Sequence, residues 1–389
     1  MLKPLRKATW APRAPEGRSP RRRRRCGFAL ACVVLVLVFS SSISISQESV
    51  GPTTDWRPPA PFRIRDLTLP NALVLGLIPV PPETVGHGSW AFELIYSHAN
   101  TFQAGGGIQE YLSRRDRRDP LSPADVVAVL SEFGDDAFYI DGEFGLANFS
   151  VHHGLTRNLD AFVNIPYFVF TGGIFDGVIE GFHDAIGATQ AGRDLVARDQ
   201  FQILIPYSGG EVVLLEPPSS GGFGDPVLGL RYAWPVLGNG WRVGLEAAAK
   251  IPVAESGALL SSGSADYGAQ LALGRTWSKN ALVINASYVI TGGFDGAPGL
   301  EPANLPALNL TYLHRLGARS TLVLQLLTAG SIFSDTTDSS LSDLEFQTTI
   351  GVKWELRNGF VGIAVTENVL NYDNTPDIAG HVSFGVVMF

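Results

Sequence analysis

Hydrophobic and polar residues alternate with a period of two along most of the chain after residue 88. In the run 343–356, every even-numbered residue from Leu344 to Leu356 is apolar or Thr, whereas the odd-numbered residues include Glu345, Lys353 and Glu355. Successive side chains of a β-strand point to opposite faces, so this run predicts a strand with one apolar and one polar face. The same alternation recurs in 240–251.

Segments of this kind follow one another to the end of the chain. They are 89–102, 138–153, 158–170, 225–236, 240–251, 267–277, 281–290, 305–316, 321–330, 343–356, 360–370 and 379–389. A tilted strand needs roughly 9–11 residues to cross a membrane, and every segment is long enough.

The connections between these segments alternate in length. Short ones span 154–157, 237–239, 278–280, 317–320 and 357–359, whereas the others span 103–137, 171–224, 252–266, 291–304, 331–342 and 371–378. Tight turns at one end and long loops at the other are typical of outer-membrane barrels. We therefore predict an all-β fold over residues 89–389: a transmembrane, antiparallel, up-and-down β-barrel of about twelve strands, with periplasmic termini and short helices in extracellular loops.

The composition agrees with a lipid-facing outer surface. Only 17% of the 389 residues are charged and 10% are aromatic, against about 25% charged in ordinary domains. Aromatic residues such as Trp90, Trp234 and Trp277 lie near the ends of segments, as membrane-interface girdles would require. The small number of Lys and Arg residues excludes a nucleic-acid binder.

Residues 1–46 have the pattern of a cleaved export signal. A basic stretch ending at Arg21–Arg25 precedes an apolar core at 27–39 and small residues before Gln47. Ten of the 29 Lys and Arg residues and one of the 37 Asp and Glu residues lie here, so the remaining chain carries a net charge of −17. Cys26 and Cys32 also lie here, so the exported protein has no disulfide. We predict export to the bacterial outer membrane.

Residues 47–88 are rich in proline and cannot form a central strand. They are interpreted either as a periplasmic leader or as a plug, with the apolar stretch 67–78 in the pore mouth. At the other end, Phe389 closes the last strand. A terminal aromatic residue resembles the signal read by the barrel-assembly machinery, which we predict as a partner together with membrane lipid and a small solute.

Several Gly- and Asp-containing stretches occur in a characteristic order along the chain. They are 154–160, 175–184, 192–194, 222–226, 250–252, 263–267 and 367–374. In this order they resemble the bacterial outer-membrane family known as domain of unknown function 3187. The resemblance implies a barrel in the outer membrane and implies no established activity.

If the apolar faces point to lipid, the polar faces line the lumen. The predicted lining residues are Glu143, Asp160, Arg231, Arg242, Glu246, Lys250, Lys353 and Glu355. Charged side chains in this position either select solutes by charge or pack a lumen that conducts little. Arg242, Glu246 and Lys250 are spaced by four residues and form a ladder of alternating charge on one wall.

Two helices are predicted within the long loops, at 122–133 and 175–186, and are expected to fold over or into the pore. In the first, Ser122 caps the helix and Pro123 occupies its first turn. In the second, Asp176, Glu180, His183 and Asp184 share one face. This face is a candidate for a divalent metal site. The favoured alternatives are a solvated helix face or a wall of the constriction, so no metal or cofactor is predicted.

Enzymatic motifs are missing from the sequence. It contains no Gly-x-Ser-x-Gly elbow, phosphate loop, His-Glu-x-x-His motif or cysteine cluster, so no enzyme is predicted. The predicted function is passive passage or binding of small solutes through a narrow, partly occluded lumen. The alternative is a non-conducting structural or surface-interaction barrel.

Overall fold

The alternating segments form the strands of a closed barrel. The computed structural model describes residues 56–389 except 188–189, 191, 208–209, 238–239, 296–301, 333–341, 369–374 and 389. Its barrel strands are β1 (Trp90–Ala104), β2 (Tyr139–Gly154), β3 (Leu159–Thr171), β7 (Val227–Ala233), β8 (Trp241–Lys250), β9 (Asp266–Trp277), β10 (Asn280–Ile290), β11 (Leu305–Arg315), β12 (Ser320–Ala329), β13 (Glu345–Leu356), β14 (Gly359–Glu367) and β15 (Ile378–Met388). The predicted export signal and Phe389 lie outside the described residues.

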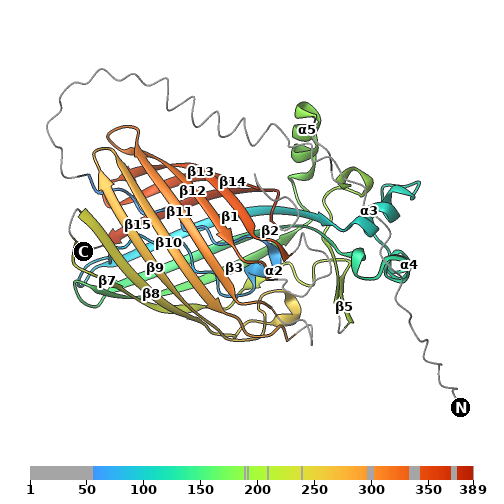
Figure 1. Cartoon of the computed structure of the whole chain (residues 1–389), viewed down its shortest axis with the longest axis horizontal. Coiled ribbons are helices and arrows are strands. Elements are labelled where there is room, and N and C mark those ends of the chain that lie inside the picture. Colours follow the sequence, from blue (N-terminus) through green and yellow to red (C-terminus); the bar gives the residue numbers. More distant parts are fainter. Residues whose placement is uncertain are drawn as a thin grey trace, which may run out of the picture. The chain divides into compact units, whose positions relative to one another are not determined.

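Each strand pairs antiparallel with its neighbours, and pairing of β1 with β15 closes the sheet (Figure 1). Closure leaves the barrel without unpaired strand edges, which a membrane requires. The twelve-stranded antiparallel barrel predicted from the sequence is therefore confirmed, with short turns at one end and long connections at the other.

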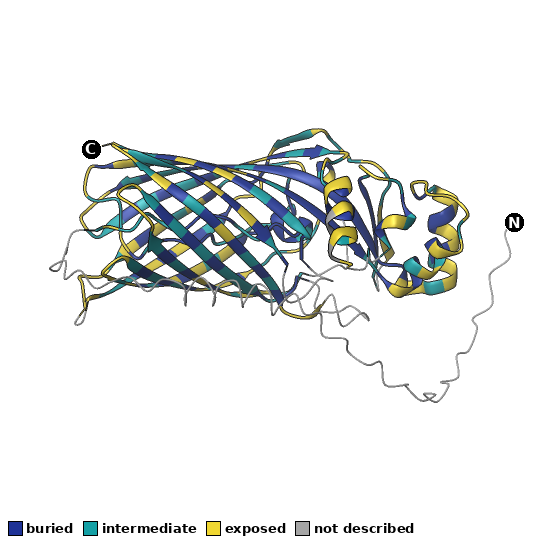
Figure 2. Cartoon of the chain, turned by 90° about the horizontal axis from the view of Figure 1, so that it is seen from above, coloured by how far each residue is buried: buried dark blue, intermediate teal, exposed yellow. Residues whose placement is uncertain are grey.

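Burial alternates along the strands, as Figure 2 shows by the change between blue and yellow. Outward residues such as Leu230, Ile350 and Phe384 are exposed and apolar, whereas inward residues are mostly buried and polar. On β9, exposed Trp277 and Tyr267 are ten residues apart, about 33 Å along a strand. A tilt of about 40° reduces this to about 25 Å, the height of an outer-membrane apolar band.

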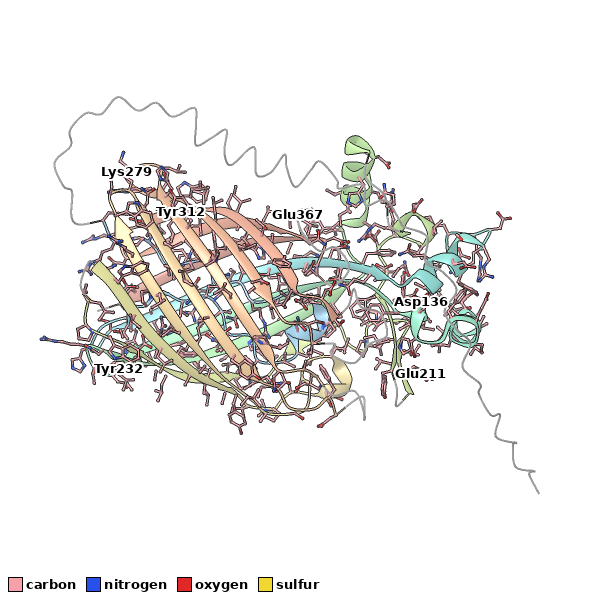
Figure 3. All side chains as sticks on the ribbon, in the orientation of Figure 1. Asp136, Glu211, Tyr232, Lys279, Tyr312 and Glu367 are labelled. Atoms are coloured by element: carbon pink, nitrogen blue, oxygen red, sulfur yellow. The ribbon has the colours of Figure 1, made fainter. Side chains whose placement is uncertain are left out.

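Exposed tryptophans mark the short-turn end of this band. Trp90, Trp234, Trp277 and Trp354 are each about two-fifths exposed. At the long-loop end, Tyr167, Tyr267 and Tyr288 are exposed in the same way. Figure 3 places Lys279 at the short-turn end and Asp136 and Glu211 beyond the opposite end.

Two long connections, residues 105–138 and 172–226, form a loop cap beyond the barrel. The cap contains α3 (Gly106–Ser113), α4 (Pro123–Phe133), α5 (Asp176–Ile186), the 3-10 helices η1 (Gly134–Ala137) and η2 (Arg193–Leu195), and the strands β4 (Gln202–Tyr207), β5 (Gly210–Leu214) and β6 (Gly221–Phe223). Ile108, Val129 and Leu204 belong to its own apolar core. The further 3-10 helix η4 (Ser256–Ala258) lies in the connection after β8.

Local sequence explains the two predicted helices. Ser122 caps α4 and forms a capping box with Asp125, and Pro123 follows at the first position. Gly187 ends α5 in the left-handed conformation. Neither helix enters the lumen, because both lie in the loop cap (Figure 1). Among the described residues, no helix is both long and apolar enough to span a membrane.

Candidate functional site

Residues 56–88, here called the N-terminal hairpin, run through the lumen and back. Arg57 lies at the short-turn end, where it lines a cavity with Arg157. The chain reaches α2 (Leu69–Ala72) near the long-loop end, where Lys250 Nζ donates to the carbonyl of Leu73 at 2.8 Å. It then returns, and the amide of Val85 donates to Asp160 at the short-turn end. The lumen therefore holds two arms of the chain.

The two arms are held to each other and to the wall. Arg65 Nη2 donates across the hairpin to the carbonyl of Val74 at 2.5 Å. Inward side chains donate to further hairpin carbonyls: Lys353 to Ala60 and Pro61, Gln325 to Phe62, Gln270 to Ile78, Asn285 to Val80, and Arg231 to Pro81 and Glu83. Buried carbonyls need such donors, so the wall supplies the hydrogen bonds that this irregular segment lacks by itself.

Glycines on the wall make room for hairpin side chains. A Cβ atom added to Gly362 would lie 2.6 Å from the ring of Phe62. A Cβ atom added to Gly274 would lie 2.7 Å from Cγ of Pro82, and no wall atom would be nearer than 3.8 Å. Both contacts are closer than carbon atoms tolerate, so these positions fit the hairpin only as glycine.

The predicted residues Asp160, Arg231 and Glu246 form one row across β3, β7 and β8. Arg231 faces Asp160 in one register pair and Glu246 in the next. Its Nε atom lies 3.6 Å from Asp160 and 3.7 Å from Glu246, and all three side chains are buried. A buried charge needs opposite charges nearby, and the row supplies them.

The predicted ladder Arg242, Glu246 and Lys250 lies on the inner face of β8, but its members do not pair with one another. Lys250 Nζ lies 3.4 Å from Asp225 and 3.1 Å from Asp266. Arg242 instead pairs with Glu83 of the hairpin at 2.9 Å. Four residues along a strand span about 13 Å, so each charge meets a different neighbour.

The remaining predicted lining residues also lie on inward faces. Lys353 is fully buried and bonds the hairpin, whereas Glu355, two residues closer to the short turn, is only half-buried. Glu143 is buried near the long-loop end, where it accepts hydrogen bonds from His98, Asn100 and the amides of Ile174 and Phe175. Glu143 therefore anchors the loop cap to β1 and β2.

The acidic face of α5 meets arginines. Asp176 pairs with buried Arg193, and Glu180 pairs with Arg118 and Arg198. Asp184 accepts from Gln190 at 2.8 Å, and His183 lies on the same helix. Within the part of the chain that the structure describes, no group of three or more His, Cys, Asp or Glu side chains is placed to hold a metal ion.

Arginine pairing sets the electrostatics of the loop cap. Burial raises the pKa of Glu180, but hydrogen bonds from Arg198 and Arg118 outweigh it, so the pKa lies below its ordinary value. Burial likewise raises the pKa of Asp377, and here the attraction of Arg193 does not fully offset it. Glu180 is therefore held ionised, whereas Asp377 is harder to ionise than an ordinary aspartate.

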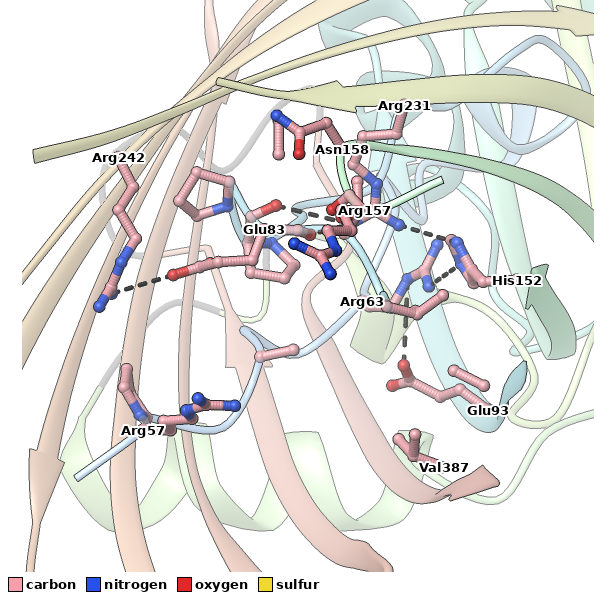
Figure 4. A pocket seen from close by; sticks show the side chains of 18 of the residues that line it. Arg57, Arg63, Glu83, Glu93, His152, Arg157, Asn158, Arg231, Arg242 and Val387 are labelled. Atoms are coloured by element: carbon pink, nitrogen blue, oxygen red, sulfur yellow. Dashed lines mark hydrogen bonds and ion pairs between the residues drawn. The ribbon is translucent and has the colours of Figure 1, made fainter. Parts of the chain in front are cut away.

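A cavity of about 700 Å³, here called the basic vestibule, lies at the short-turn end (Figure 4). Its charged lining comprises Arg57, Arg63, Arg157, Arg231, Arg242, Glu83 and Glu93, beside His152. Arg57, Arg63 and Glu83 come from the hairpin, and the others come from the barrel. Five arginines face two glutamates, although residues 47–389 together carry a net charge of −17.

Less space remains deeper in the lumen. A cavity of about 50 Å³ lies between the hairpin and β9 to β12, lined by Arg65, Asp66 and Asn285 among others. At the long-loop end, a cavity of about 170 Å³ is lined mainly by apolar residues of α2, β4 and β5, including Leu69, Leu73 and Ile203. The hairpin thus borders all three cavities.

Comparison with known proteins identifies the family. Residues 125–386 match the family described as protein of unknown function (DUF3187), and the chain belongs to it. This confirms the resemblance stated from the sequence. No curated protein matches the chain.

Solved barrels share low similarity with the chain. An outer membrane channel from Pseudomonas putida F1 is 11% identical, covers 80% of this chain and 100% of its own, and has a TM-score of 0.48. The NanC porin is 8% identical, and its alignment covers 76% of this chain and 98% of the porin with a TM-score of 0.37. The toluene transporter TbuX from Ralstonia pickettii is 9% identical, and its alignment covers 85% of this chain and 96% of the transporter with a TM-score of 0.38.

Sequence reasoning did not single out Arg63, Arg193 or the wall glycines. Arg63 lies in a segment without periodicity, so no pattern indicates that it faces the lumen. Gly362 and Gly274 do interrupt inward faces of strands, and glycine within a strand is a known sign of close approach by another backbone or ligand. That signal was available in the sequence.

Proposed function

We propose that the protein is an outer-membrane barrel through which small solutes pass passively, and that the N-terminal hairpin is the constriction. The observation that carries the proposal is the fit between hairpin and wall: the carbonyls of Pro61, Ile78 and Val80 each accept from an inward side chain. These contacts come from side chains and not from strand pairing, so the hairpin can move away from the wall without unfolding the barrel sheet.

The cavities support this proposal. The basic vestibule opens at one end, the apolar cavity lies at the other, and the narrow part between them is bounded by the hairpin. Selection would be steric and electrostatic. Glu143, Asp160, Arg231, Arg242, Glu246, Lys250, Lys353 and Glu355 would contribute as wall charges, and most of them act through the hairpin or through a neighbouring ion pair.

A cross-link tests this proposal. Gln347 Nε2 donates to Asp66 of the hairpin at 2.7 Å, and the exported chain contains no cysteine. In the Asp66→Cys/Gln347→Cys protein, a short bismaleimide would tie the hairpin to β13. We expect stepwise conductance in planar bilayers for the unlinked protein and its loss after linking, with each single-cysteine variant unaffected by the reagent. A channel that is equally open after complete cross-linking would contradict the proposed gate.

The second candidate is a non-conducting barrel that acts through its loops. The small space in mid-lumen favours it, because only about 50 Å³ remains beside the hairpin there. The loop cap with its own apolar core would then be the functional part. A lumen that stays closed over the full voltage range, in the wild type and in Lys250→Ala and Arg242→Ala, would support this candidate.

Two finer parts of the proposal rest on sequence alone. Residues 1–46 would be removed on export, and Phe389 would be read by the barrel-assembly machinery. Mass spectrometry of the membrane-inserted protein tests the first, because the mature chain should begin at Gln47. Deletion of Phe389 tests the second and should lower the amount of heat-modifiable barrel in the membrane.

A further inference from the structure

We propose that the basic vestibule binds a small organic anion, with buried Arg63 as its anchor. The proposal names the class of solute for the passage proposed above and in that sense rests on it. Binding itself is measured without transport, so the two can fail independently.

Arg63 has donors without acceptors. The side chain is almost fully buried and lines the vestibule, and its Nη1 atom contacts Nε2 of His152. Its Nε and Nη2 atoms have no hydrogen-bond partner within the described part of the chain, and Glu93 lies 3.9 Å from Nε. Buried guanidinium donors that lack acceptors are costly, and a rotation of the side chain toward an anion in the vestibule would give them acceptors.

His152 adds to the excess of donors. Its Nε2 atom faces Arg63, and its Nδ1 atom lies 2.8 Å from Nη2 of Arg231. A neutral imidazole has a single acceptor nitrogen, so it can accept a hydrogen bond from only one of these arginines. The other contact brings two donors together. Figure 4 shows the three side chains in a row at the side of the vestibule.

The acidic groups near the vestibule each face an arginine that is already present. Glu83 pairs with Arg242 at 2.9 Å, and Asp160 and Glu246 flank Arg231. Glu93 approaches only Nε of Arg63. The guanidinium groups of Arg57 and Arg157 line the vestibule more openly and have no ion-pair partner among the residues that the structure describes. Two open cations therefore remain for a ligand, beside buried Arg63, whose acidic neighbour is Glu93 at 3.9 Å.

The rest of the lining indicates an organic ligand. Ala91, Phe360 and Val387 contribute apolar surface from the inward faces of β1, β14 and β15, and a cavity of about 700 Å³ is far larger than an inorganic ion needs. Planar guanidinium groups bind carboxylates and phosphates through two parallel hydrogen bonds. A ring or chain carrying one or two such groups would meet both parts of the lining.

Calorimetry on the detergent-solubilised full-length barrel tests the proposal, with benzene-1,4-dicarboxylate as the probe and benzamide as its uncharged counterpart at constant ionic strength. We expect the dicarboxylate to bind and benzamide not to bind. The Arg63→Gln protein should lose at least tenfold in affinity, and Arg157→Gln should lose several-fold. Arg315→Gln is the matched control, because Arg315 is half-buried at the same end, does not line the vestibule, and its side chain bonds only the carbonyls of Gly317 and Ala318.

Heat-modifiable gel mobility shows whether each variant is folded. If Arg63→Gln does not fold, the test of anion binding rests on Arg157→Gln, because Arg157 is exposed. The proposal is overturned if the folded wild type does not bind the dicarboxylate, if benzamide binds equally well, or if both variants bind like the wild type. Conductance without anion binding would overturn this inference and leave the proposed passage standing.

Discussion

Lys353 Nζ donates to the carbonyl of Pro61 at 2.9 Å, across the lumen from β13 to the N-terminal hairpin. The same ammonium group donates to Ala60 at 2.9 Å and lies 4.8 Å and 4.1 Å from the ring centroids of Phe62 and Phe360. Carbonyls and aromatic faces together replace the water that a buried lysine gives up. Lys353 is therefore an anchor of the hairpin.

Replacing Lys353 by Met should loosen the first arm of the hairpin. The substitution keeps an unbranched side chain but leaves two buried carbonyls without donors, a loss of about 1–3 kcal/mol in holding the arm. We expect faster amide hydrogen exchange in residues 62–68 and more frequent channel opening. Glu355→Gln is the control on the same strand and face, and an equal response of both variants would argue against a specific anchor.

Enlarging Gly274 should displace the second arm. In Gly274→Val the added carbons would overlap Pro82, whereas the nearest wall atom is 3.8 Å from the first of them. Overpacking of this kind costs about 1–3 kcal/mol, and the hairpin should shift before the hydrogen-bonded sheet does. We expect raised exchange over residues 83–88 with an unchanged heat-modifiable shift. Gly380→Ala on β15 is the control, because its added methyl group would meet only Phe175, at 3.9 Å.

The barrel was predictable from the sequence because each strand repeats one rule. Lipid on one side and a polar lumen on the other force alternation, and the alternation locates all twelve strands. The hairpin follows no such rule. Its prolines lack N–H groups, so its fold is set by carbonyls that meet donors such as Gln270 and Asn285 more than 190 residues away. Pairing of that kind leaves no local pattern.

In the loop cap, too, the local sequence predicts some elements and leaves others without a signal. Helices α4 and α5 carry capping and periodic signals and were predicted within one residue, whereas α3 and β4 to β6 are short and form against neighbours. The acidic face of α5 was visible in the sequence. Its partners were not, since Arg118, Arg193 and Arg198 come from separate turns of the cap.

Removing Arg193 should detach the loop cap from the barrel. Arg193 bonds Asp176 of α5, Asn100 of β1 at 2.8 Å, and Asp377 before β15. In Arg193→Met the buried carboxylates lose their counter-charge, which typically costs about 3–5 kcal/mol. We expect protease cleavage within residues 172–200 while the barrel stays heat-modifiable. Arg114→Gln, which breaks an exposed pair with Glu132, should leave cleavage at the wild-type rate.

Acid should loosen α5 through Glu180. Its pKa is lowered in the folded protein, so its ion pairs stabilise the cap above the unfolded pKa of about 4.3 and lose this effect as the pH falls through the folded pKa. Asp377 acts in the opposite direction, because its raised pKa makes protonation favourable to the fold. The difference between the wild type and Glu180→Gln isolates the contribution of Glu180.

Hydrogen exchange of the α5 peptide between pH 7 and pH 3.5, corrected for intrinsic rates, measures this difference. The wild type should lose protection below about pH 4, whereas Glu180→Gln should be less protected at pH 7 and nearly independent of pH. Glu211→Gln, at an exposed position on β5, should follow the wild type. If Glu180→Gln retains the wild-type pH profile, the arginine pairs of Glu180 do not hold α5, and the cap depends on Arg193 and its apolar core alone.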